Sequence, residues 1–320
     1  MTARTIGLLT LLALSASGAG AADLSAAANA NDQRLAAIGD RLATANAALC
    51  DRRQPRPGWM LHAVDQYLAQ PLAPGQTVKE FEAPVAVALV LTESPAARTG
   101  IRADDALVAI AGHPLPAPPS GKPSARTRDA AEALVADQPA DSPLPVTLLR
   151  DGTRRTVTIP ASPGCRVTFE VLAGSGLKAS SDGRVVQLSP GFFRWTDAEV
   201  AVVVAHELAH AVLHHRERLE AAGVKWGLLA EFGRNRRLFR RTEDDADRLS
   251  IALLLNAGYD PASAPAFWRA HGDAVGGGFF RARTHGSSGA RAEAMAAEVA
   301  AIPAGVVRPW VPPILATRDQ

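Results

Sequence analysis

The sequence lacks several features that would place it in a protein class at once. Aromatic residues make up only 5% of it, and 34 basic residues almost balance 32 acidic ones, which leaves a formal net charge of +2. So small a charge gives no strong positive field, and this argues against a protein built mainly to hold nucleic acid. No stretch reaches the roughly 20 consecutive apolar residues that a membrane-spanning helix needs.

Cysteine is scarce as well, since Cys50 and Cys165 are the only two in the chain. If both are oxidised they can pair only with each other, and the bridge would join the N-terminal segment to the start of the C-terminal half. Two alternatives stay open. The thiols could be free and buried, or they could bind a metal, although neither lies in a CxxC pattern.

The composition and the N-terminal residues are typical of a globular protein that is exported. The 320 residues are 47% hydrophobic and 21% charged, which suffices for about two domains. Residues 1–22 resemble a secretory signal peptide, with Arg4, an apolar run from Ile6 to Leu14 and small residues after it. The alternative is an N-terminal membrane anchor, for which the apolar run is short. We expect a protein that is periplasmic or secreted and soluble once the signal is removed.

Residues 23–58 are predicted to form a helix and a linker that pack on a C-terminal domain. Leu35, Ile38 and Leu42 recur at three- and four-residue steps, as on the apolar face of an amphipathic helix. The following stretch, 51–58, contains two prolines and a glycine and is typical of a linker. A domain boundary is therefore expected near residue 58.

Residues 59–162 form a second unit, in which short β-rich runs alternate with turns. Val85–Leu91 and Ala106–Ile110 are strand-like, and Asp151-Gly152 between two alternating runs predicts a β-hairpin. One predicted helix, Thr127–Ala136, interrupts the strands. The unit is thus expected to be β-rich.

The segment from Ser94 to Gly112 resembles the central signature of PDZ domains of the bacterial protease type. The resemblance implies that a peptide adds as an extra strand beside Val85, Val87 and Leu89, which would then be substrate-binding residues. The alternative is a PDZ module that only packs on its neighbour and binds nothing.

The chemistry lies in residues 163–320. Thr196 and Glu199 form a capping-box pattern that starts a helix, and the helix continues into His206-Glu207-Leu208-Ala209-His210. Histidines four residues apart lie on one helix face, where both imidazoles can reach one zinc ion, and Glu207 on the adjacent flank can reach a water beside it. The alternative, two histidines without a metal, is disfavoured by the apolar helix around them.

A third ligand is expected downstream. Thr242 starts a predicted second helix that ends at Gly258, and on it Glu243 and Asp247 share a face. The natural assignment makes Glu243 the third zinc ligand and lets Asp247 orient a ligand histidine through its other ring nitrogen. The alternative is a charged first turn, in which the acids merely interact with the helix dipole.

Together with Ala246-Asp247-Arg248 and Ala257–Pro261, these residues resemble the zinc endopeptidase family of HtpX, BepA and the CAAX prenyl endopeptidase. The resemblance covers roughly Cys165 to the end. It implies one zinc per chain, held by His206, His210 and Glu243, with Glu207 as catalytic base.

The family's later Thr-His-Pro-type segment corresponds to Thr284-His285-Gly286-Ser287, and Arg291 stands at the position of the family's usual arginine. His285 is the candidate for stabilising the oxyanion of the transition state, with loop capping as its alternative role. Two departures concern substrate choice. Gly286 replaces the expected proline, and Lys178 stands where many relatives have an asparagine.

Between the two motif helices, residues 226–241 mix apolar side chains with five arginines. This pattern allows peripheral contact with an anionic membrane surface or an acidic substrate; the alternative is a helix docked by its apolar face with a solvated cationic side.

The sequence therefore predicts an α+β multidomain protein, in which a β-rich PDZ domain (59–162) precedes a mainly helical metalloprotease domain with a small sheet (163–320). Its predicted function is that of an exported zinc metalloendopeptidase acting on polypeptides, with a role in envelope protein quality control. The alternative is a peptide-binding chaperone or adaptor whose zinc site has little or latent activity. The sequence assigns no nucleic-acid partner and no oligomeric state.

Overall fold

The protein has an α+β fold with about 48% helix and 20% strand. The computed structural model describes residues 20–67, 82–117, 124–224, 233–275 and 287–319. Its buried apolar side chains form two separate cores. One lies within residues 61–159, and the other combines residues 35–50 with residues 165–314.

The helices are α1 (Gly20–Ala45), α2 (Pro95–Arg98), α3 (Arg126–Ala136), α4 (Asp197–Val212), α5 (His215–Ala221), α6 (Gly233–Asn256), α7 (Ser263–Val275) and α8 (Ser288–Ala300). The strands are β1 (Arg53–Pro55), β2 (Trp59–Ala63), β3 (Val85–Val90), β4 (Ala106–Ile110), β5 (His113–Pro114), β6 (Leu144–Arg150), β7 (Thr153–Ile159), β8 (Pro163–Cys165), β9 (Thr168–Val171), β10 (Ala179–Ser181) and β11 (Val185–Leu188). Short 3-10 helices span Ala47–Leu49, Val64–Gln66, Pro190–Arg194 and Pro313–Asp319.

The first core lies between a six-stranded sheet and α3, which covers it. The strand order of the sheet is β2-β3-β4-β6-β7, and β5 pairs with β4. The predicted hairpin is present as β6 and β7, because Asp151 and Gly152 both adopt the positive φ angles that a two-residue turn between twisted strands requires. Ala131 and Val135 of α3 are buried against this sheet.

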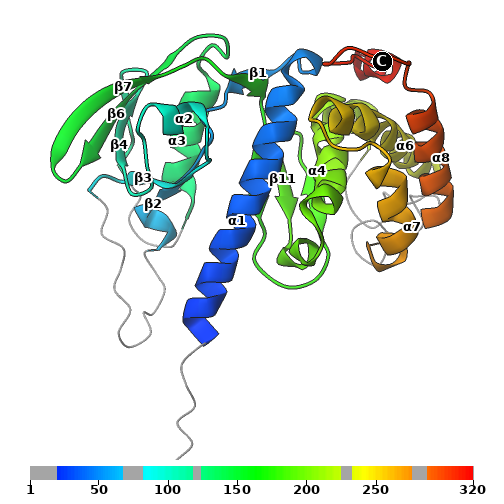
Figure 1. The fold of residues 1–320 in the computed structure, drawn as a ribbon, viewed down its shortest axis with the longest axis horizontal. Coiled ribbons are helices and arrows are strands. Elements are labelled where there is room, and N and C mark those ends of the chain that lie inside the picture. The colour runs from blue at the N-terminus through cyan, green and yellow to red at the C-terminus, as the bar shows by residue number, and fades with distance from the viewer. Residues whose placement is uncertain (1–19, 68–81, 118–123, 225–232, 276–286, 320) are drawn as a thin grey trace, which may run out of the picture.

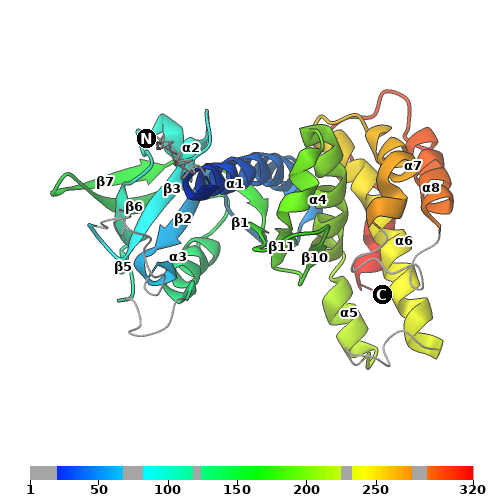
Figure 2. The same cartoon turned by 90° about the horizontal axis from the view of Figure 1, so that it is seen from below.

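The second core is mainly helical and contains a three-stranded sheet of order β10-β11-β9. Helix α4 lies at its centre and packs against α1, α6 and α7 and on β10 and β11, and α8 packs on α6 and α7. Figures 1 and 2 show α1 running between the six-stranded sheet and this helical part. The N-terminal helix therefore belongs to the second core, on which its apolar face packs.

The stretch 51–58, expected as a linker, is more ordered than predicted. It contains β1, which pairs antiparallel with β8 from Arg53 opposite Cys165 to Pro55 opposite Pro163. Cys50 and Cys165 form a disulfide beside this pair, with their Cα atoms 5.4 Å apart. Prolines do not prevent such pairing, because a two-stranded ribbon leaves one side of each strand without ladder bonds.

Helix α6 differs from its predicted form because it begins at Gly233, well before Thr242. The acidic residues of the second motif therefore lie in the middle of a helix, and a first-turn dipole effect does not explain them. On the same helix Arg236, Arg237, Arg240 and Arg241 are exposed, whereas residues 225–232 lie outside the described part, so contact with a membrane surface stays a prediction.

In the described residues, no helix is long and apolar enough to cross a membrane.

We expect the disulfide to contribute strongly to stability, since it links residues 115 positions apart and so restricts the unfolded chain. Replacing Cys50 and Cys165 together by serine should lower the free energy of unfolding by about 4–5 kcal/mol on the chain-entropy model. Guanidinium unfolding of the double variant, beside the wild type with and without reductant, measures this. A loss below about 1 kcal/mol would contradict the expected contribution.

Candidate metal centre

Helix α4 carries the HExxH motif and is fixed by its cap and by burial on every side. Thr196 is its N-cap, and the backbone N–H of Thr196 donates to Oε2 of Glu199 at 2.9 Å, which completes the capping box. From Val200 to Ala209 every residue is buried. A helix that is buried around its circumference belongs in a core, so the two motif histidines that it carries are held on a rigid element.

His206, His210 and Glu243 meet between α4 and α6 and form a group that can hold a metal ion. Nε2 of His206 lies 3.1 Å from Oε2 of Glu243 and 3.2 Å from Nε2 of His210, and Nε2 of His210 lies 3.6 Å from Oε2 of Glu243. Donor atoms about 2.1 Å from a tetrahedral ion lie about 3.4 Å apart. The three spacings therefore suit one small cation with a further coordination position left open.

The chemistry of these donors also fits a cation. Burial disfavours a charged His206, but hydrogen bonds and charges from Asp247 and Glu243 outweigh it and raise the pKa of His206 to about 10. The acceptor atoms that raise this pKa would also attract a metal ion, because a proton and a metal ion compete for the same lone pairs. The side chains of His210 and Glu243 are 16% and 15% exposed and that of His206 only 1%, so the site opens to solvent on the His210 and Glu243 side.

Glu207 is 3% exposed and follows His206 on α4. Burial raises its pKa, while the neighbouring His206 and His210 act to lower it. A carboxylate whose proton affinity is raised in this way is suited to accept and release a proton.

A buried chain of polar contacts holds His206. Nδ1 of His206 lies 2.9 Å from Oδ1 of Asp247, and Arg291 donates from Nε and Nη2 to the two Asp247 oxygens at 2.8 and 2.6 Å. Burial alone would raise the pKa of Asp247, but the Arg291 charge and the hydrogen bonds from His206 and Arg291 lower it to about 2. Arg291 in turn stacks on Trp268, 3.5 Å from its ring centre. Asp247 is thus an ionised acceptor that fixes the His206 ring.

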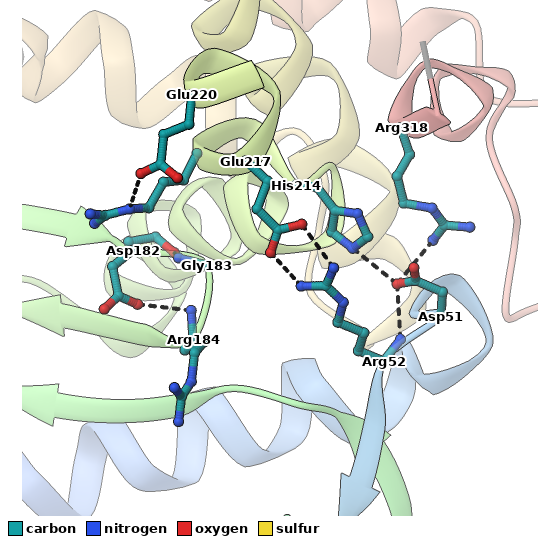
Figure 3. Close-up of polar contacts among 11 residues, drawn as sticks. Asp51, Arg52, Asp182, Gly183, Arg184, His214, Glu217, Glu220 and Arg318 are labelled. Carbon is teal, nitrogen blue, oxygen red and sulfur yellow. Dashed lines mark hydrogen bonds and ion pairs between the residues drawn. The ribbon is translucent and has the colours of Figure 1, made fainter. Parts of the chain in front are cut away.

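The two histidines after the motif have different roles. Helix α4 ends at Val212, and His214 adopts a left-handed conformation with φ 52°. Figure 3 shows its Nε2 directed at Asp51, 3.1 Å away, beside Arg318 and the ion pair of Arg52 with Glu217. His214 therefore points away from the metal ligands.

His215 is buried, and its Nδ1 lies 2.9 Å from Nδ1 of His210. Burial and the nearby His210 lower the pKa of His215 to about 2, so it is neutral. Helical periodicity did not predict this contact, because the turn at His214 breaks the helix. The consecutive histidines were the only signal in the sequence.

His285, expected near the oxyanion, lies outside the described residues.

A cavity of about 650 Å³ lies between the two cores. Its walls come from α1 and β9 on one side and from β2, β3 and α3 on the other. The PDZ resemblance predicts peptide addition beside Val85, Val87 and Leu89, but their strand, β3, pairs with β2 on one side and β4 on the other. Val85 and Val87 are fully buried, and only Leu89 lines the cavity. Among the described strands β2 and β7 lie at the edges of this sheet, so the prediction is wrong in its position for Val85 and Val87.

The cavity contains carboxylates in excess of cations. Arg128 of α3 pairs with Glu170 of β9 at 2.6 Å. Asp32 and Glu132 also line the cavity, and within the described part of the chain neither has an ion-pair partner. Burial raises the pKa of Asp32, and it raises that of Glu132 to about 7, with Arg128 acting in the opposite direction. The cavity is therefore suited to a cationic group.

No protein-family model matches the chain, and no curated protein matches it.

Asp247→Asn should lower the free energy of unfolding by about 3–5 kcal/mol near neutral pH, because it leaves Arg291 buried without its carboxylate. Asp244→Asn, exposed on the same helix, should change it by less than about 0.5 kcal/mol. The pKa of Asp247 is lower when folded, about 2, than its usual 3.8, so the wild-type advantage is full above pH 3.8 and disappears as the pH falls through 2. Urea unfolding between pH 2 and 7 tests both statements; equal stability of the two variants at pH 7 would contradict them.

Proposed function

We propose that this protein is a zinc-dependent metalloendopeptidase. The observation that carries the proposal is the convergence of His206, His210 and Glu243 from two packed helices, with the buried Glu207 next to them. Two imidazoles and one carboxylate are a zinc donor set that leaves a position for substrate or water. Glutamate and histidine donors at these spacings favour zinc over calcium or magnesium, which prefer oxygen ligands.

Zinc in this site would supply a Lewis acid that polarises a peptide carbonyl and makes water more acidic. Glu207 takes a proton from the attacking water and passes it to the leaving amine, a role that its raised pKa favours. Asp247 holds the His206 ring throughout, and Arg291 keeps Asp247 ionised. The buried surroundings of α4 keep these groups in place before substrate arrives.

The small sheet offers a place for the substrate backbone. Strand β10 packs beside α4, and within the described residues its outer edge pairs with no strand. Lys178, directly before β10, accepts from and donates to Ser189 through its backbone, which fixes the start of the strand. An extended polypeptide can pair with such an edge irrespective of its sequence, which suits an enzyme acting on unfolded proteins.

Export accords with the disulfide and with the signal-like pattern of residues 1–22, because disulfides persist in oxidising compartments. We therefore propose a periplasmic or secreted enzyme that takes part in protein quality control of the envelope. The β-rich unit of residues 59–162 would act as a PDZ-type module that binds polypeptide for the metal centre.

A second candidate is a peptide-binding chaperone or adaptor with little proteolytic turnover, for which the cavity between the cores offers a binding surface that needs no metal. The cavity is large enough for a side chain and the adjoining backbone, and one wall is β2, which lies at an edge of the sheet among the described strands. Both candidates use this surface to hold polypeptide, and they differ only in whether the metal centre cleaves it.

Glu207→Gln should reduce cleavage of an unfolded model protein at least about 100-fold, because the amide cannot accept the proton. We would measure cleavage and zinc content of the chain without residues 1–22. The variant should retain about one zinc per chain, since Glu207 is not a ligand. Glu220→Gln, exposed on α5, is the matched control and should cleave at the wild-type rate. Full zinc in an inactive wild type would favour the chaperone.

The charges of the cavity predict a preference for basic peptides. A peptide with one lysine should bind about fivefold more tightly than its norleucine analogue, as expected for a half-buried ion pair worth about 1 kcal/mol. The preference should grow between pH 6 and 8, as Glu132, whose pKa is about 7, loses its proton. Titration calorimetry with both peptides measures it. Glu132→Gln should remove the pH dependence, and its persistence would assign the preference to other residues.

A further inference from the structure

His215 contacts His210, and the mechanism proposed above does not use this contact. His215 is 1% exposed, its Nδ1 lies 2.9 Å from Nδ1 of His210, and the two ring planes are inclined at 77°. Nε2 of His215 is buried and has no hydrogen-bond partner in the described part of the protein. Among the described residues the His215 side chain has its hydrogen-bond contact with His210 alone, a candidate metal ligand, and a buried polar group in such a place needs a functional explanation.

The position of one hydrogen decides what this contact does. Two ring nitrogens at hydrogen-bond distance need one donor and one acceptor. When His210 offers the lone pair of Nε2 to a metal, its hydrogen lies on Nδ1, so His210 donates. Nδ1 of His215 then accepts, and the hydrogen of His215 lies on Nε2.

We propose that His215 is a positioning residue, which holds His210 in the tautomer and ring orientation that direct Nε2 towards His206 and Glu243. The proposal rests on the metal centre proposed above. His215 acts on His210 as Asp247 acts on His206, so each histidine ligand has its own acceptor behind it.

The two acceptors, Asp247 and His215, differ in charge, and this difference affects how much positive charge a bound cation would keep. Asp247 is anionic, but Arg291 pairs with it through two hydrogen bonds. A histidine ring that accepts through Nδ1 and carries its hydrogen on Nε2 is uncharged, so the residue behind His210 adds no negative charge to the site. A cation there keeps more of its positive charge than it would with carboxylates behind both histidines, which favours polarisation of a carbonyl.

The turn after α4 makes the contact possible. Five residues of continuous helix would rotate position 215 by about 140° from position 210, away from it. The left-handed conformation of His214 instead ends α4 and starts α5 at His215. Figure 3 shows that Asp51 anchors His214 at this turn, and Asp51 follows Cys50 of the disulfide. The N-terminal segment thus secures the residue that orients His210.

Two substitutions separate this role from packing. His215→Asn places an amide oxygen close to the position of Nδ1 and can still accept, whereas His215→Leu fills more of the volume without an acceptor. Zinc affinity, measured by competition with a chelator, should fall 10- to 100-fold in the leucine variant and stay within about threefold of wild type in the asparagine variant. In the zinc-loaded wild type, ¹⁵N spectra of the histidine rings should show His210 protonated at Nδ1.

Thermal unfolding of both variants in chelator reports any packing effect separately from zinc binding. The control is His271→Asn, because His271 is partly buried and pairs with Glu199. This variant should bind zinc like the wild type. Unchanged affinity in His215→Leu, or equal losses in the leucine and asparagine variants, would overturn the positioning role and leave the metal centre standing. A wild type that binds no zinc would overturn both.

Discussion

The buried ion pair between Asp247 and Arg291 is the constraint on which the candidate metal centre depends. Two charges withdrawn from water are stable only when each is satisfied, and here the carboxylate accepts both from the guanidinium and from the His206 ring. Because Asp247 lies on α6, Arg291 on α8 and His206 on α4, the pair sets the separation of three helices. It brings Glu243, one turn before Asp247, to the donor atoms of α4.

The parts of this arrangement that follow from local periodicity could be predicted from the sequence. Histidines four apart on a capped, apolar helix must share a face, and so must Glu243 and Asp247. The hairpin at Asp151-Gly152 followed from the turn that these residues favour, and it is present. In each case residues within a few positions of one another determine the geometry.

What could not be predicted depends on contacts between distant segments or on a break in periodicity. The pairing of β1 with β8 joins residues on either side of the six-stranded sheet, and nothing in stretch 51–58 alone indicates it. The position of β2 outside β3 depends on tertiary pairing in the same way. The contact of His215 with His210 could not be predicted, because the left-handed conformation of His214 redirects the chain. Helical periodicity gives the direction of a side chain only while the helix is continuous.

The ribbon of β1 and β8 also determines how the chain is divided. Together with the disulfide it brings residues 50 and 165 side by side, so the chain leaves the helical core and returns to it at one place. Topologically, the entire six-stranded sheet is an insertion into a loop of the helical core. An insertion closed at its base can change in length or sequence without altering the register of α1 or α4, so the six-stranded sheet and the helical part with the candidate metal centre are free to diverge at different rates.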